Sequence, residues 1–87
     1  MMQLDQNQIE DLQGILSVVD MLTVPEQLEY FEYLMQARPM KVDARPPHCS
    51  VEYIGITGKG ASLNIAATNW IANARDHLAQ IDAKEVA

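Results

Sequence analysis

The chain has 87 residues, a formal net charge of −6 and a single cysteine, Cys49. A chain of this length buries only about 60–65% of its unfolded surface, which fits one domain over residues 1–87 with a thin core and favours a homodimer. With 48% apolar and 21% charged residues, the composition is that of a globular protein and excludes a disordered or fibrous one.

Three features predict a cytoplasmic protein that makes no contact with a membrane. Residues 1–6 are polar and acidic, whereas a secretory signal begins with a basic and then an apolar region. No apolar run approaches the ~20 residues that span a bilayer. A lone cysteine cannot form an internal disulfide, which fits a reducing compartment.

The acidic side chains are concentrated in the first part of the chain. Residues 1–37 hold seven acids and no lysine or arginine, whereas residues 38–87 hold five acids and six basic residues. A field this one-sided repels nucleic acid and favours a protein partner with a basic surface. The alternative is that the acids only form a solvated helix face. The seven acids are Asp5, Glu10, Asp11, Asp20, Glu26, Glu29 and Glu32.

Residues 5–22 have the apolar periodicity of a helix. Asp5 followed three positions later by Gln8 predicts a capping box, in which each residue's side chain binds the other's backbone N–H. Gly14 is a weak point, because glycine inside a helix costs about 1 kcal/mol relative to alanine. The apolar stripe comprises Ile9, Leu12, Leu16 and Val19.

Residues 24–37 form the second predicted helix. Thr23 and Glu26 have the spacing of a capping box, and Pro25 fits the first turn, where its missing N–H costs nothing. The short connection between the helices implies an antiparallel helical hairpin over residues 5–37. The core stripe of the second helix comprises Leu28, Phe31 and Met35, with Leu34 beside them.

Residues 38–49 form a proline-rich connector in which residues 40–44 can make a short strand. Pro46 and Pro47 prevent one continuous strand through this region. Residues 50–57 are the best strand, being β-branched, aromatic and partly alternating. A lone strand needs a pairing partner, so this strand pairs either with residues 40–44 or with a second chain.

The last helix is predicted to begin at Ser62 and to end near Asp82. In this preferred interpretation the chain reverses at residues 58–60 and Ser62 caps the helix. The result is a strand–turn–helix unit over residues 50–82, followed by a frayed tail at residues 83–87. The apolar face of the helix comprises Leu63, Ala67, Trp70, Ala74, Leu78 and Ile81, and Trp70 and Leu63 are expected to anchor the core.

A second interpretation of the same region stays open. Residues 58–60 could be a hairpin turn, with residues 62–66 as a second strand and a helix beginning near Thr68. The first interpretation is preferred because the apolar face begins cleanly at Leu63, although Ile65 fits it badly. Both predict an α+β fold with an N-terminal helical hairpin, a short strand or two-stranded ribbon, and a C-terminal amphipathic helix.

The glycine-rich turn does not match a phosphate-binding motif. With Gly58-Lys59 as the G-K pair of G-x-x-x-x-G-K-[ST], the upstream glycine falls at Tyr53 and the hydroxyl residue at Gly60. The dinucleotide pattern G-x-G-x-x-G fails at Leu63. What remains is a weak anion site at the start of a helix, formed by Lys59, Gly60 and Ser62.

Nucleic-acid modules fit the chain no better. Gly55-Ile56-Thr57-Gly58 has the G-x-x-G spacing of a KH loop but lies inside a strand-like run. The order of strand, glycine turn and helix resembles the end of a double-stranded-RNA-binding domain, but Lys59 is the one lysine there. With this net charge we do not expect nucleic acid as a partner. A nucleic-acid or nucleotide-binding domain that uses the Gly58-Lys59-Gly60 turn is kept as an alternative.

The residues that could carry catalysis show no suitable pattern. His48 and Cys49 are adjacent and His77 lies far along the chain, whereas a nucleophile needs a base in contact and a group that orients it. Spacings such as C-x-x-C or H-x-x-x-H, which hold metals, are absent from the sequence. We therefore expect no enzymatic activity, no metal and no cofactor.

The acidic helical hairpin is then the best candidate for function. We expect a small acidic interaction protein, an adaptor or inhibitor that binds a basic surface of another protein, in the style of a phage or mobile-element accessory protein. The alternative of a structural subunit would oligomerise through the sheet edge or through the stripe of Gly14, Val18 and Met21. The residues expected to contact the partner are Glu26, Glu29, Tyr30, Glu32 and Tyr33.

Overall fold

The computed structural model describes residues 4–86 and confirms the α+β fold. It contains two N-terminal helices, a three-stranded antiparallel sheet and a C-terminal helix, so the sheet has one strand more than the predicted ribbon. In chain order the elements are α1 (Gln6–Asp20), α2 (Val24–Ala37), β1 (Lys41–Asp43), β2 (Cys49–Tyr53), β3 (Ile56–Gly60) and α3 (Leu63–Val86).

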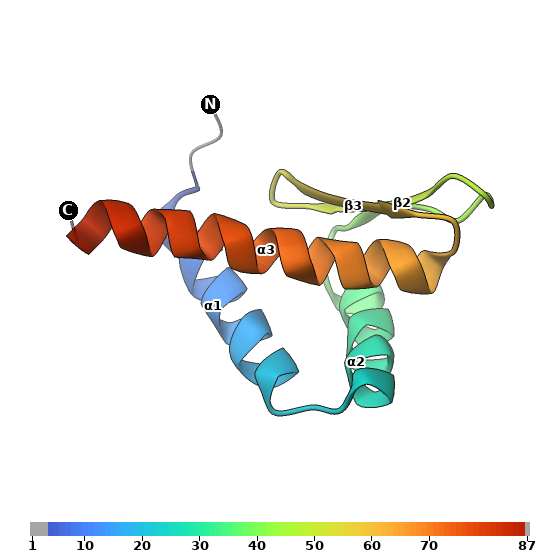
Figure 1. The fold of residues 1–87 in the computed structure, drawn as a ribbon, viewed down its shortest axis with the longest axis horizontal. Helices are drawn as coiled ribbons and strands as arrows, with labels where there is room; N and C mark the ends of the chain where they lie inside the picture. Colours follow the sequence, from blue (N-terminus) through green and yellow to red (C-terminus); the bar gives the residue numbers. More distant parts are fainter. Residues whose placement is uncertain (1–3, 87) are drawn as a thin grey trace.

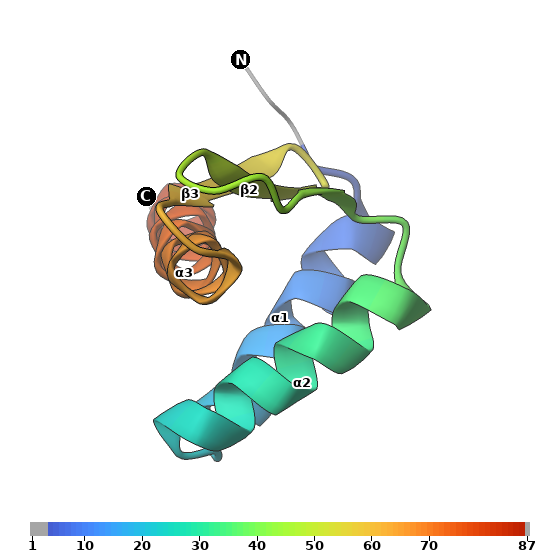
Figure 2. The same cartoon turned by 90° about the vertical axis from the view of Figure 1, so that its right-hand side faces the viewer.

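The long helix α3 runs between the other two parts of the molecule. Figure 1 shows the sheet along one side of α3 and the helices α1 and α2 on the other side, where they form a V whose tip points away from α3. Figure 2, seen nearly along α3, shows that no helix covers the outer face of the sheet. The molecule measures 41 × 29 × 19 Å. Helix α3 is thus the element on which both the sheet and the helical pair pack.

The predicted start of α1 is confirmed in detail. The Asp5 N–H donates to Gln8 Oε1 at 3.0 Å, and the Gln8 N–H donates to Asp5 Oδ1 at 2.8 Å. The face opposite the core is solvated, since a Cβ added at Gly14 would meet nothing within 4 Å. The buried residues of α1 are Leu12, Ile15, Leu16 and Val19, of which Ile15 was not in the predicted stripe.

Helix α2 begins as predicted and is tied back to the end of α1. The Thr23 N–H donates to Glu26 Oε1 at 2.9 Å. The side-chain amide of Gln27 donates to the carbonyls of Val19 and Leu22 at 3.0 and 3.2 Å. Carbonyls at a helix end are short of intrahelical donors. The Val19 carbonyl also accepts the Leu22 N–H at 3.1 Å, and Gln27 adds a second donor there and one at Leu22, which holds the tip of the V.

The single strand predicted at residues 50–57 is wrong, because the chain turns at Ile54-Gly55 in its middle. Both residues have positive φ, 46° and 78°, as a two-residue hairpin turn requires. A β-branched residue rarely takes this conformation, so the sequence pattern hides the turn. The side chain of Ile54 is partly buried against the core, and this packing offsets the backbone strain.

The predicted reversal at residues 58–60 is also wrong, since these residues lie in β3 and pair with β2. A Cβ at Gly58 would lie 2.2 Å from the Ala66 carbonyl oxygen and 2.3 Å from the Trp70 backbone nitrogen. Glycine is therefore needed here because β3 and α3 approach backbone to backbone. The glycine pattern reflects this packing and not a turn.

The preferred start of the last helix is confirmed, and the alternative strand at residues 62–66 is wrong. The Ser62 hydroxyl oxygen accepts the Ile65 N–H at 3.3 Å, and α3 begins at Leu63. Helix α3 continues to Val86, past the predicted end near Asp82. Ala87, the last residue of the predicted tail, lies outside the described residues.

Trp70 is the centre of the core, as predicted. It is fully buried, its ring lies 5.5 Å from that of Phe31, and its Nε1–H donates to the Ile56 carbonyl at 3.0 Å. Leu63, the other expected anchor, is only partly buried at the margin. The buried core comprises Leu4, Leu12, Ile15, Leu16, Val19, Phe31, Leu34, Cys49, Val51, Ile56, Ala66, Ala67, Trp70, Ile71 and Ala74.

Candidate protein-interaction surface

The outer face of α2 is an acidic, solvent-exposed strip. Its members lie at helical spacings of three, four and seven and are all exposed, and Tyr33 retains 62% of its surface. No lysine or arginine occurs on α1 or α2. The strip therefore offers negative charge together with one aromatic ring. We call these residues, Glu29, Glu32, Tyr33 and Gln36, the outer face of α2.

Five of the seven N-terminal acids have partners within the described part of the chain, among them Asp5 with the Gln8 N–H and Glu10 with the Gln6 side-chain amide. The Asp20 carboxylate pairs with Arg75 of α3 at 2.7 Å. Glu26, one of the predicted contact residues, accepts the Thr23 N–H, and this bond lowers the pKa of its carboxyl group. Asp11 pairs with Arg38 at 3.0 Å. These carboxylates stabilise the fold, so less of their charge is available to a partner.

Glu29 and Glu32 differ from these acids, because neither makes a hydrogen bond or ion pair within the part of the chain that the structure describes. Both side chains are exposed on the middle of α2. Carboxylates with no structural role can be paired with an external cation at little cost to the fold. Of the five predicted contact residues, all but Tyr30 are exposed, and Glu26 is the exposed one that is already bound, by the Thr23 N–H.

Tyr30 and Tyr33 stack on the flank of α2 but differ in exposure. Their ring centroids lie 6.3 Å apart, with an angle of 18° between the ring planes. Tyr30 packs partly against the core, and burial raises the pKa of its phenol. Tyr33 is the outer member of the pair, so the stack holds an exposed ring in place beside Glu29. Aromatic residues that are rigid and exposed are enriched at protein interfaces.

An exposed apolar tip adjoins this acidic face. Met21 and Val24, at the turn between α1 and α2, retain 78% and 66% of their surface. In Figure 1 this turn is the point of the V, remote from α3 and the sheet. Met21 belongs to the possible dimer stripe predicted from the sequence, whereas Val24 belongs to no predicted site. Met21 and Val24 are exposed because the tip of the V lies away from the core.

The Asp11 carboxylate accepts hydrogen bonds from two side chains, those of Arg38 and Tyr53, and no sequence pattern predicted this network. Asp11 accepts from Arg38 Nε and Nη2 at the end of α2, and from the Tyr53 hydroxyl at 2.5 Å at the end of β2. Burial would raise the pKa of Asp11, but the bonds from Arg38 and Tyr53 outweigh it and the pKa is lowered. Burial and the bond to Asp11 raise the pKa of Tyr53 to about 12. The network joins α1, α2 and the hairpin.

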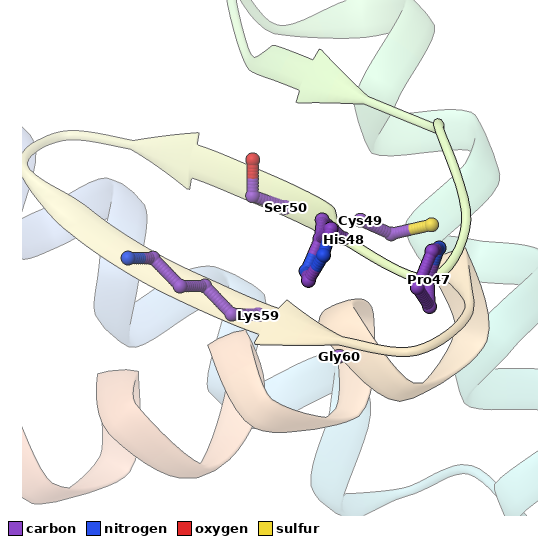
Figure 3. A pocket seen from close by; sticks show the side chains of 6 residues that line it. All are labelled: Pro47, His48, Cys49, Ser50, Lys59 and Gly60. Carbon is purple, nitrogen blue, oxygen red and sulfur yellow. The ribbon is translucent and has the colours of Figure 1, made fainter.

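The predicted weak anion site is only partly assembled. Lys59 and Gly60 line an open hollow of about 460 Å³ at the end of the sheet. Ser62 does not line this hollow, because its hydroxyl caps α3. We call the hollow the sheet-end hollow, and Figure 3 shows its lining residues. These are Pro47, His48, Cys49, Ser50, Lys59 and Gly60.

Metal-ligating side chains do not gather within the described part of the chain. No group of three or more His, Cys, Asp or Glu side chains in this part of the chain is arranged to hold a metal ion. Cys49 is buried with 2% exposure, whereas the neighbouring His48 is exposed. None of the described helices combines the length and apolarity needed to cross a membrane.

Comparison of the chain with protein-family models, with curated proteins and with solved structures found no match.

Proposed function

We propose that this chain is a small acidic interaction protein that binds a basic surface of another protein through the outer face of α2. The observation that carries the proposal is that Glu29 and Glu32 are exposed on one helix face and have no partner within the described residues. Tyr33 lies beside Glu29 on the same face with 62% exposure. A basic partner would pair with the two carboxylates and pack against the ring.

The apolar tip supports the same surface. Met21 and Val24 lie at the end of α2 from which the acidic face begins, so one partner could cover both. Protein interfaces combine an apolar centre that supplies affinity with charges that speed and orient association. We propose that the chain acts as an adaptor or inhibitor of this kind, in the style of a phage or mobile-element accessory protein.

The first experiment is affinity capture with the tagged full chain, followed by binding measurements with the purified partner. The double change Glu29→Lys and Glu32→Lys should weaken binding at least about tenfold, because attraction becomes repulsion at two sites. Binding by the unchanged chain should also weaken as salt is added, since surface charges are screened within a Debye length of about 10 Å at 0.1 M salt.

A control variant separates the acidic face from net charge. Asn64→Lys, Thr68→Lys and Asp76→Lys together add four positive charges on α3, as the two Glu→Lys changes do on α2, and all three positions are exposed. This triple variant should bind nearly as tightly as the unchanged chain. Binding that resists salt and survives Glu29→Lys with Glu32→Lys would show that α2 is not the contact surface.

A further inference from the structure

The sheet-end hollow carries an inference that is independent of the acidic surface. The hollow lies where the connector enters β2 and where β3 ends, and its volume is about 460 Å³. Pockets that hold small molecules are commonly of about 300–1,000 Å³. The volume is thus sufficient for a small organic ligand and exceeds what a bare inorganic anion needs.

The lining is locally positive in a chain of net charge −6. It includes one lysine, one histidine and one serine, and no carboxylate. Ser50 and Lys59 are direct cross-strand partners, so their side chains lie on the same face of the sheet. His48 precedes β2 and projects towards β3 in Figure 3. The three side chains can each donate a hydrogen bond to an anion.

The nearest acids on this face already have basic neighbours. Asp43 is the cross-strand partner of Ser50, and its carboxylate is bound by Arg45 at 2.8 Å. Glu52 lies two residues beyond Ser50, and Lys41 stands opposite it in the backbone register of β1 and β2. Within the described residues Lys59 makes no ion pair, and it is exposed. Its ammonium group is therefore available to an external anion.

The residues that line the hollow are of two kinds. His48, Ser50 and Lys59 supply donors, while Pro47, Cys49 and Gly60 add no charged group. Lys59 extends along β3 in Figure 3, and its flexible four-carbon stem allows the ammonium group to turn over the hollow. The anionic group of a ligand would bind the donors, and a compact uncharged part of the same ligand would lie against the uncharged lining residues.

We propose that the sheet-end hollow binds a small phosphate monoester, with the phosphate held by Lys59, His48 and Ser50. A phosphate monoester carries about −1.5 to −2 charges at pH 7 and three acceptor oxygens, which matches three donors, one of them the Lys59 ammonium group. A polyanionic strand fits less well, because the seven acids of residues 1–37 repel an extended chain of phosphates.

The test is a titration of the isotope-labelled full chain with adenosine 5′-monophosphate, followed by amide chemical shifts. Saturable shifts should appear at His48, Ser50 and Lys59. Adenosine without phosphate should give no saturable shift, and inorganic phosphate should bind more weakly than the monophosphate. Lys59→Gln should weaken binding about tenfold, as loss of one charge-assisted hydrogen bond does. Arg75→Gln, which removes an exposed positive charge on α3 outside the hollow, should leave it unchanged.

Three results would overturn the proposal. They are the absence of saturable shifts at millimolar ligand, equal binding by the Lys59→Gln variant, and equal binding of adenosine. A short single-stranded oligonucleotide that binds the same residues more tightly than the monophosphate would instead assign the hollow to nucleic acid. These outcomes are independent of whether Glu29 and Glu32 bind a protein partner.

Discussion

The side-chain amide of Asn73 on α3 donates to the carbonyl of Thr57 on β3 at 2.7 Å. One helical turn earlier, the amide of Asn69 donates to the carbonyl of Lys59. Thr57 and Lys59 are two residues apart, so their carbonyls point the same way. Since β3 is an edge strand, the two asparagines occupy acceptors that another strand would otherwise use, which discourages pairing at this edge.

Removing these amides should therefore promote self-association through β3. The double variant Asn69→Ala with Asn73→Ala should form larger species at lower concentration than the unchanged chain, as light scattering across a concentration series would show. Asn64→Ala on the same helix is the matched control, because the Asn64 side chain makes no hydrogen bond within the described residues. The unchanged chain in this series also tests the predicted homodimer. Equal mass curves for all three proteins would show that the asparagines do not protect the edge.

Gly58 and Gly14 should respond in opposite ways to alanine. A Cβ at Gly58 would lie 2.2 Å from the Ala66 carbonyl oxygen, so Gly58→Ala should destabilise the fold by about 1–3 kcal/mol or more through overpacking. A Cβ at Gly14 meets nothing within 4 Å, so Gly14→Ala should stabilise it by about 1 kcal/mol. Urea unfolding followed by circular dichroism measures both. A neutral Gly58→Ala would contradict the close approach of β3 and α3.

Trp70 should contribute both packing and a hydrogen bond. Trp70→Ala removes a fully buried ring and should cost about 3–5 kcal/mol. Trp70→Phe retains a ring against Phe31 but leaves the Ile56 carbonyl without the indole N–H, and should cost about 1–3 kcal/mol. Denaturant midpoints would give this order. Midpoints unchanged in both variants would show that Trp70 is not the anchor of the core.

The network at Asp11 predicts how stability changes in alkali. The pKa of Tyr53 is raised from 10.0 to about 12 in the folded chain, whereas the phenol ionises near 10 when unfolded. The folded state therefore keeps the proton longer, and its stability should fall as pH rises from about 10 to 12. Burial also raises the pKa of Tyr30, so the comparison must be made between variants.

Tyr53→Phe provides that comparison, because it removes the titrating group and leaves the ring beside Trp70. Thermal melts of both proteins between pH 8 and pH 12 would show a smaller alkaline loss for Tyr53→Phe. In the folded chain the pKa of Asp11 is lowered from its ordinary value of 3.8. The stability that Asp11 contributes should therefore be lost as the pH falls through that lowered pKa. Asp11→Asn should reduce that acid loss. Parallel curves for all variants would exclude the network as a source of pH dependence.

The candidate surface was partly visible in the sequence. Helical periodicity alone places Glu29, Glu32 and Tyr33 away from the stripe that contains Phe31, and the structure exposes all three. The Asp11 network was not visible, because Arg38 and Tyr53 lie 27 and 42 positions further along the chain. No local pattern reports a contact over such separations.

By itself, the sequence determined the features that depend on residues within one or two helical turns. The capping boxes at Asp5 and Thr23, the start of α3 after Ser62 and the α+β class all follow from such local interactions. Only the tertiary structure decided where the hairpin turns and why the glycines are there. Ile54 adopts a conformation that isoleucine avoids, because its side chain then packs on the core. Gly58 lies within a strand because α3 crosses too close for any side chain. Both outcomes depend on packing between segments that meet only in the folded chain, which local propensity cannot report.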